Sequence, residues 1–219
     1  MSHVALLMQE YVTHDTHRFI VERPEHLSWE PGQGVELAID NIQWRDEGHP
    51  FTPISQANDR VVEFMIKRYD TDGLTQALHQ LEPGSGLVLS DSFGNIRYRG
   101  PGVFIAAGTG ITPFLAIFRK LAMKGELEQQ HLICSNKSEK DLICGDELRH
   151  LLGERALFTF TREHEQAHDG HHIDAAFLSG HIDDLGQLFY VCGPNGFVET
   201  VNNALITLGV HPDRLIYEQ

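Results

Sequence analysis

The second half of the chain alternates short apolar runs with segments of helical periodicity, and this alternation limits the fold more than any other feature. The apolar runs occupy residues 103–107, 131–134, 156–160 and 188–192, and a helical pattern follows each of them. Runs that are apolar at every position are typical of strands buried on both faces of a parallel sheet, with helices packed over it. The sequence therefore predicts a C-terminal α/β domain built on a parallel sheet.

The first half shows a different pattern, in which short stretches of strand character are separated by turns. These stretches are residues 4–8, 18–21, 35–38, 60–67 and 87–90. One helical stretch, residues 74–81, interrupts them. Several short strands at close spacing favour a small antiparallel β-barrel. The pattern changes near residues 99–102, so we expect two domains, residues 1–99 and residues 100–219.

Composition and charge narrow the functional class. The 219 residues carry a formal charge of −14, and acidic residues outnumber basic ones in both halves, so no region is basic enough to attract nucleic acid. No apolar run approaches the ~18 residues of a membrane span, and the N-terminal residues lack the pattern of a secretory signal. The three cysteines are too few for a disulfide framework or an iron–sulfur cluster. We expect a cytoplasmic protein without a membrane span or a nucleic-acid partner.

A glycine turn follows the first apolar run of the α/β half and leads into a helix. It consists of Gly108, Thr109 and Gly110, with Thr112 in the first helical turn. Glycines at such a place allow close backbone approach to a pyrophosphate, and the helix N-terminus adds unpaired N–H groups and positive potential. The motif therefore indicates a dinucleotide site, although a similar turn often does no more than connect a strand to a helix.

A second turn, made by Cys192, Gly193 and Pro194, closes the fourth apolar run and opens another helix. The carboxyl ends of parallel strands face one crevice, where ligands bind. We therefore expect both glycine turns to lie on the same cleft. Cys192 by itself fits simple core packing equally well.

In the barrel half, the segment His49, Pro50, Phe51 and Thr52 places an aromatic ring beside a hydroxyl group. The ring of Phe51 can stack on a planar ligand, and the hydroxyl of Thr52 can bond to a ring nitrogen. A loop with one buried phenylalanine is the alternative interpretation.

Farther along the barrel half, a strand ends at Ile66 and Lys67, and a helix begins at Gly73, Leu74 and Thr75. The start of this helix offers backbone amides and a hydroxyl group. It therefore indicates a second cradle for phosphate.

Taken in order, these motifs resemble those of the ferredoxin–NADP reductase superfamily, which includes flavodoxin reductases and the reductase components of oxygenases. The resemblance covers essentially the whole chain. Its markers are Pro31-Gly32-Gln33, Phe51-Thr52 with Ser55, Gly73-Leu74-Thr75, Asp91-Ser92-Phe93-Gly94, Gly108 to Pro113, Cys192-Gly193-Pro194 and Glu218. The resemblance implies an N-terminal flavin-binding barrel and a C-terminal, Rossmann-like domain that binds a nicotinamide nucleotide.

The resemblance also implies a flavin site on the barrel. Phe51 is expected to stack on the flavin, and Thr52 to bond the N5 side of its ring. FAD is the expected flavin, with FMN as the alternative, because the adenine-binding residues cannot be recognised in the sequence. The other residues expected to hold the flavin are His49, Pro50, Ile66, Lys67, Gly73, Leu74 and Thr75.

On the α/β domain, the resemblance implies a nucleotide site next to the flavin. Thr109 is expected near both cofactors, Cys192 near the nicotinamide ring, and Glu218 close to the reacting rings, where it aids proton delivery or positions the nicotinamide. The candidate catalytic residues are Thr52, Cys192 and Glu218, although most of the catalysis is expected from the proximity of stacked rings. The other expected nucleotide contacts are Gly108, Gly110, Thr112, Gly193 and Pro194.

Two positions depart from the family pattern. The family has arginine at His49, where it makes a bidentate contact to the flavin phosphate that a largely neutral histidine cannot copy. We therefore expect weaker flavin affinity, or a substitute in Lys67 or Arg68. The family also often carries an aromatic residue after Glu218, where this chain has Gln219. We expect that face of the flavin to be open or covered by another group.

Thr161 and Arg162 predict a preference for NADP(H) over NAD(H). They follow the third apolar run and match the Ser/Thr-Arg pair that grips the 2′-phosphate in members that use NADP. A solvated loop charge is the alternative interpretation of Arg162. The second basic residue expected farther along is missing, and histidines stand there instead. We interpret these histidines as a polar surface loop rather than a metal site; they are His164, His168, His171 and His172.

These observations predict a flavin-dependent oxidoreductase that transfers electrons between NADP(H) and a one-electron carrier such as ferredoxin, flavodoxin or an oxygenase component. Two alternatives remain: an electron-relay subunit of a larger oxygenase or reductase complex, and a free-flavin reductase. The formal charge of −14 argues against an acidic ferredoxin and leaves free flavin or a basic partner open.

Overall fold

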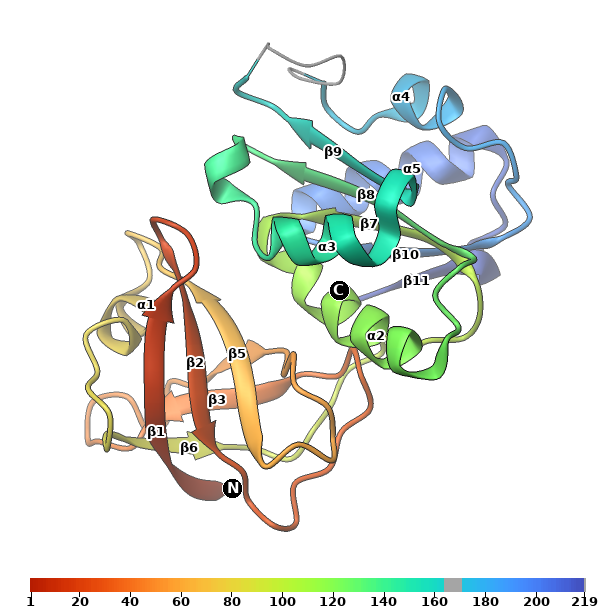
Figure 1. The fold of residues 1–219 in the computed structure, drawn as a ribbon. Helices are drawn as coiled ribbons and strands as arrows, with labels where there is room; N and C mark the ends of the chain where they lie inside the picture. The colour runs from red at the N-terminus through yellow and green to blue at the C-terminus, as the bar shows by residue number, and fades with distance from the viewer. Residues whose placement is uncertain (164–170, 219) are drawn as a thin grey trace.

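The computed structural model describes residues 1–163 and 171–218, which form two sheets with no strand in common (Figure 1). The first sheet is antiparallel and has the strand order β4-β3-β6-β1-β2-β5. Its strands are β1 (Ser2–Tyr11), β2 (Thr16–Glu22), β3 (Val35–Ile39), β4 (His49–Phe51), β5 (Val61–Lys67) and β6 (Gly86–Leu89). The Ile54 amide, after β4, donates to the Glu63 carbonyl of β5 at 2.8 Å, so the two ends of the sheet approach each other. The predicted barrel is confirmed, as a nearly closed one.

Alternation of buried and exposed side chains gives the barrel its core. Leu6 of β1, Phe19 of β2, Leu37 of β3 and Phe64 of β5 are completely buried. The short helix α1 (Gly73–Leu78) packs onto this core through Leu74 and through Leu78. Because each strand gives one face to the core, its register is fixed by the apolar pattern.

The second sheet is parallel throughout and has the order β11-β10-β7-β8-β9. Its strands are β7 (Gly102–Ala107), β8 (Gln130–Asn136), β9 (Ala156–Phe160), β10 (Leu188–Cys192) and β11 (Leu215–Tyr217). The helices are α2 (Ile111–Lys124), α3 (Gly145–Leu152), α4 (Ala175–Ser179) and α5 (Asn195–Leu208), with the short turns η1 (Gly108–Gly110), η2 (Glu139–Asp141), η3 (Gly153–Arg155) and η4 (Pro212–Arg214). The predicted α/β domain is confirmed.

Successive side chains of the central strand β7 enter different cores. Phe104 packs with α2 and α3, whereas Val103 and Ile105 pack with α4 and α5. Two helices therefore cover each face of the sheet (Figure 1). This burial on both faces explains why the strands of this domain are apolar at nearly every position.

The structure corrects the sequence predictions at two short strands. His49–Phe51 forms the strand β4, where the sequence predicts a turn-rich stretch, because Val35 of β3 pairs with Phe51 and Leu37 pairs with His49. Leu215–Tyr217 forms β11, which was not predicted, since three residues carry too little pattern. The predicted helix 74–81 begins one residue earlier and ends at Leu78.

The two domains share buried contacts. Ile54, Met65 and Ile96 of the N-terminal half belong to the same apolar cluster as α2. The side-chain amide of Gln56 donates to the Ala116 carbonyl of α2 at 3.1 Å, and Arg119 of α2 donates to the Ile54 carbonyl at 3.1 Å. These contacts fix the orientation of the barrel against the sheet. Within the described residues, no helix is both long and apolar enough to cross a membrane.

Candidate functional site

The glycine turn after β7 lies at the carboxyl end of the parallel sheet. Gly108 has a φ of +55°, and a side chain there would point into open space. A Cβ on Gly110 would lie 2.3 Å from the Cys192 carbonyl oxygen, so only glycine fits where the two turns touch. The Thr112 hydroxyl donates to the Thr109 carbonyl at 3.0 Å and secures the start of α2. Both predicted turns therefore share one edge of the sheet, as expected for a nucleotide cleft.

Cys192 ends β10 at this edge, directly opposite Ala106 of β7. Burial, and then the charge of Glu218, raise the pKa of the Cys192 thiol to about 12. The thiol is therefore neutral at physiological pH, and it is a small apolar wall or a weak donor rather than a nucleophile.

Glu218 follows β11 and reaches the barrel domain. Its Oε1 accepts a hydrogen bond from the Asn95 amide at 2.8 Å. A Cβ on Gly94 would lie 2.2 Å from the same oxygen. The carboxylate is thus held in a close fit against the turn that joins the barrel to the α/β domain.

A second contact between the domains joins Tyr69 and Thr109. Tyr69 follows β5, and its hydroxyl lies 3.4 Å from the hydroxyl of Thr109 in the glycine turn. Its backbone amide donates to the Thr75 hydroxyl of α1 at 3.1 Å. The ends of β5, β7, β10 and β11 therefore meet at one junction, which contains Thr109, Cys192 and Glu218.

The predicted flavin residues lie on the barrel side. Phe51 and Thr52 are partly exposed at and just beyond the end of β4, where an aromatic face and a hydroxyl can meet a planar ring. Ile66 is completely buried, and its carbonyl bonds to the His79 ring at 2.8 Å. Its side chain therefore supports the strand from inside the core.

The structure reveals an acidic residue in the predicted phosphate cradle that the sequence analysis missed. Asp72 caps α1 by accepting from the Thr75 amide at 3.2 Å. Its other carboxylate oxygen lies 3.1 Å from Nδ1 of His49. His49, which stands where the family has arginine, is therefore already engaged with a carboxylate. The sequence around Asp72 does not indicate this contact, because His49 is distant in the chain.

Lys67 is directed to the domain interface. Its ammonium lies 2.6 Å from Asp15 in the turn between β1 and β2, and 3.8 Å from Asp141 of η2. Burial raises the pKa of Asp15, but hydrogen bonds from Lys67 and Thr13 outweigh it and leave this pKa below its ordinary value. Lys67 thus links the barrel to the α/β domain in an ion pair.

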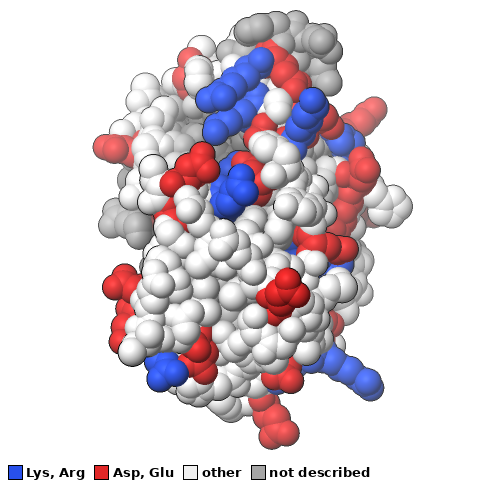
Figure 2. All heavy atoms as spheres, turned by 90° about the vertical axis from the view of Figure 1, so that its left-hand side faces the viewer, with Lys and Arg blue, Asp and Glu red and all other residues white. Residues whose placement is uncertain are grey.

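Arg162 lies beside cations that come from the neighbouring strand. Its amide donates to the Lys137 carbonyl at 2.9 Å, and the Thr161 amide donates to the Asn136 carbonyl at 2.9 Å. Lys137, Lys140 and Arg162 line one hollow at the ends of β8 and β9. Figure 2 shows Lys and Arg side chains gathered on the upper half of this face, among acidic ones. The cations beside Arg162 thus come from before it in the chain, whereas the sequence analysis expected a second basic residue after it.

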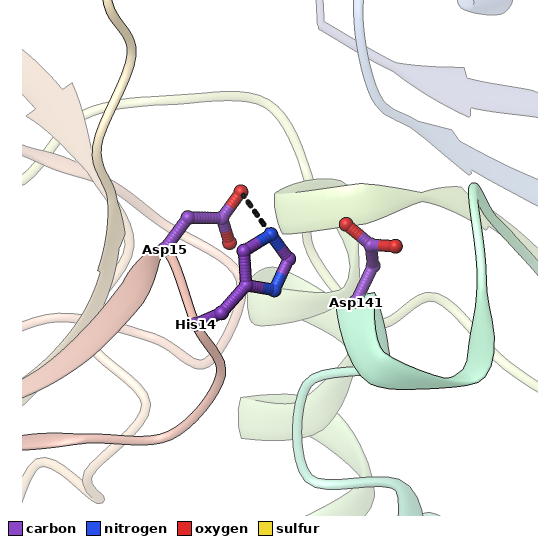
Figure 3. Close-up of side chains that lie close together, drawn as sticks. All are labelled: His14, Asp15 and Asp141. Carbon is purple, nitrogen blue, oxygen red and sulfur yellow. Dashed lines mark ion pairs between the residues drawn. The ribbon is translucent and has the colours of Figure 1, made fainter.

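Among the described residues, His14, Asp15 and Asp141 form a group whose ligand atoms lie within 4.8 Å of one another (Figure 3). A metal ion needs such spacing, but the Lys67 ammonium lies 2.6 Å from Asp15 and 3.8 Å from Asp141 and already offsets one of the two negative charges. The predicted polar histidine loop falls partly outside the described residues, which exclude His164 and His168; His171 and His172 are exposed.

Comparisons with known proteins agree with this arrangement. Residues 3–98 match the model of the oxidoreductase FAD-binding domain, and residues 104–203 match that of the oxidoreductase NAD-binding domain. The chain belongs to the ferredoxin–NADP reductase superfamily of flavoproteins.

Two curated relatives illustrate the likeness. NADH-cytochrome b5 reductase 2 of Mycosarcoma maydis is 26% identical, over 86% of this chain and 60% of the relative. The toluate 1,2-dioxygenase electron transfer component of Pseudomonas putida is 25% identical, over 88% of this chain and 59% of the relative. The chain thus spans about three fifths of the length of these relatives. A ferredoxin NADP+ reductase from Neisseria gonorrhoeae with bound FAD and NADP has the same fold, with a TM-score of 0.86 at 18% identity, covering 99% of this chain and 97% of that chain.

The side chains of the barrel fit one part of a flavin better than the other. The ring end has the partly exposed Phe51 and Thr52, and Gly108 leaves open space at the junction. The phosphate end has His49, which faces the Asp72 carboxylate instead of an open position. The residues therefore suit the flavin ring better than its charged tail.

Proposed function

We propose that this protein takes hydride from a nicotinamide nucleotide, preferably NADP(H), and passes the electrons through a bound flavin to a separate carrier. The observation that carries this proposal is the junction where Thr109, Cys192 and Glu218 of the α/β domain face the barrel. Each domain brings its own predicted cofactor site to this junction, so the two rings can stack. A bound flavin supplies the ability to accept two electrons at once and release them singly.

The residues of the junction position the rings. The Tyr69–Thr109 contact and the Glu218–Asn95 bond hold the two domains at a fixed separation. The neutral Cys192 thiol offers the nicotinamide a surface without charge. A carboxylate at Glu218 suits the positive charge that the nicotinamide gains as hydride leaves. Orientation of this kind accounts for most of the expected rate.

The preference for NADP(H) is supported by the cations around Arg162. A 2′-phosphate carries close to two negative charges, and an arginine fork can bond it at two oxygens. Lys137 and Lys140 line the same hollow and add charge. At least two relatives are named as NADH enzymes, whereas the Neisseria structure holds NADP, so the names of relatives do not decide between the nucleotides.

The experiment compares kcat/KM for NADPH and NADH, with ferricyanide as the acceptor, in the wild type and in Arg162→Ala. We expect the wild type to favour NADPH. In the variant, kcat/KM for NADPH should fall by a factor that corresponds to ~1–3 kcal/mol, while kcat/KM for NADH is unchanged. Arg60→Ala, which removes an exposed arginine of the barrel domain, is the control. A wild type that favours NADH would refute the proposed nucleotide choice.

The proposed acceptor is an electron-carrier protein such as an oxygenase component. The net charge of −14 makes a neutral or basic carrier the better match, and it disfavours an acidic ferredoxin. Free flavin is a second candidate, because the His49–Asp72 pair leaves little charge to grip a flavin phosphate. Steady-state turnover of NADPH with excess FMN, and with no protein acceptor, distinguishes the two.

A further inference from the structure

The hollow that contains Arg162 is built by both domains. Its volume is about 340 Å³. The α/β domain contributes the segment from Lys137 to Asp141 and Arg162, and the barrel contributes His14 and Asp15 from the turn between β1 and β2. A ligand that enters this hollow from the α/β side therefore meets the barrel on the opposite wall.

The charges of the hollow leave a positive excess. Asp15 and Asp141 face the ammonium of Lys67, at 2.6 and 3.8 Å. Asp141 is also engaged by its own turn, since its Oδ2 accepts from the Ser138 hydroxyl at 2.6 Å and from the Ser138 amide at 3.0 Å. Lys137, Lys140 and Arg162 are the cations that remain for a ligand. The hollow consequently suits a small dianion such as a phosphate monoester.

His14 is held at the edge of this hollow by the structure of its turn. Asp15 accepts the Arg68 amide on its carbonyl at 2.7 Å and the Thr13 hydroxyl on its carboxylate at 3.0 Å. These bonds hold the turn against the barrel, and the Lys67–Asp141 pair at 3.8 Å reaches from it to the α/β domain. Figure 3 shows the imidazole of His14 between the carboxylates of Asp15 and Asp141, and Nε2 lies 3.6 Å from Asp15. The side chain is 63% exposed, so a ring nitrogen can reach a ligand.

We propose that His14 is a specificity-determining residue, supplied by the flavin domain, which donates a hydrogen bond to the 2′-phosphate of the nucleotide opposite Arg162. This inference rests on the proposed preference for NADP(H). Recognition of the 2′-phosphate then depends on the two domains being docked, because one wall of its site belongs to each. NADH has a neutral hydroxyl at this position, which gains less from a hydrogen-bond donor than a charged phosphate does.

The experiment measures binding rather than turnover, by calorimetry on the purified full chain. Two fragments serve as probes: 2′,5′-ADP, which carries the 2′-phosphate, and 5′-AMP, which lacks it. We expect His14→Ala to weaken 2′,5′-ADP by about three- to tenfold and to leave 5′-AMP unchanged. His14→Lys, which restores a donor, should recover most of the loss. His131→Ala, which removes an exposed histidine at the opposite edge of the sheet, is the matched control.

The outcomes separate this inference from the proposed function. If Arg162→Ala weakens 2′,5′-ADP but His14→Ala does not, the role of His14 is refuted and the NADP(H) preference stands. If the wild type binds the two fragments equally, both are refuted. An equal loss of both fragments in His14→Ala would also overturn the inference, because the effect would then be structural. Thermal unfolding of each variant shows whether the fold is preserved.

Discussion

The hydroxyl of Tyr69, just beyond the last residue of β5, lies 3.4 Å from the hydroxyl of Thr109 in the glycine turn of the other domain. Tyr69 is also tied to α1, through its amide and the Thr75 hydroxyl. One residue therefore connects the predicted flavin-phosphate helix, the barrel strand beside it and the nucleotide turn. Side-chain contacts of this kind, made directly between the barrel and the nucleotide domain, help to align the two.

Tyr69→Phe removes this hydroxyl and keeps the ring. The contact is long and Tyr69 is 44% exposed. We therefore expect kcat/KM to fall by a factor that corresponds to at most about 1 kcal/mol, and by the same factor for NADPH and NADH. Steady-state kinetics with both nucleotides check this. A loss confined to NADPH would show that Tyr69 contacts the 2′-phosphate instead of aligning the domains.

Gly94→Ala tests whether the position of the Glu218 carboxylate against Gly94 matters for catalysis. The new Cβ would lie 2.2 Å from Oε1 of Glu218, and Gly94 has a φ of +107°. Gly84→Ala is a matched control, since Gly84 has a φ of +92° but nothing within 4 Å of its Cβ position. Both substitutions should cost about 1 kcal/mol of folding free energy through the backbone. We expect Gly94→Ala alone to lower kcat with either nucleotide; equal kcat values in the two variants would contradict a role for Glu218.

Stability should fall in mild acid because of a buried histidine pair. The rings of His17 and His79 stack at 3.9 Å, and Nε2 of His17 is buried with no hydrogen-bond partner among the residues that the structure describes. Burial, followed by the charges of His79 and Arg68, lowers the pKa of His17 to about 4, from 6.5. The unfolded chain binds a proton below pH 6.5 that the folded chain excludes until about pH 4. Stability is therefore lost as the pH falls through this window.

We expect the loss to reach roughly 2 kcal/mol between pH 7 and pH 5, measured by urea unfolding at each pH. His17→Phe should reduce this pH dependence, whereas His131→Gln at an exposed position should not. If His17→Phe and the wild type lose the same free energy of unfolding between pH 7 and pH 5, His17 does not cause the loss.

Asp72→Asn tests the acidic residue in the predicted phosphate cradle. Asparagine caps a helix as well as aspartate does, so the stability should be unchanged, whereas Asp72→Ala should lose about 1 kcal/mol. Removing the charge that faces His49 should tighten FAD by about 1 kcal/mol, measured by flavin titration. If Asp72→Asn binds FAD no better than the wild type, the flavin phosphate lies away from α1.

The sequence predicted a strand correctly where the residues of that strand alone carry the pattern. The strands Ala156–Phe160 and Leu188–Cys192 have the predicted bounds, because a strand buried on both faces is an apolar run with polar ends. The strand β4 was not predicted, because its three residues include a proline and form a strand only by pairing with β3.

The sequence predicted only part of the site, because the other residues are far apart in the chain and come together only when it folds. Lys67 meets Asp141 across the two domains, and no local pattern records that contact. Lys137 could have been found, since it directly follows β8, next to β9 in the sheet. The carboxyl ends of adjacent parallel strands share one edge, so the residue after β8 belongs beside Arg162.

The most direct test of the account is to load the purified chain with FAD and titrate it with NADPH in the absence of oxygen. Flavin content per chain and the bleaching of the flavin absorbance band are measured together. We predict one flavin per chain and complete bleaching by equimolar NADPH, because the two proposed cofactor sites meet at Thr109, Cys192 and Glu218. A chain that takes up neither FAD nor FMN, or a bound flavin that stays oxidised with both NADPH and NADH, would contradict it.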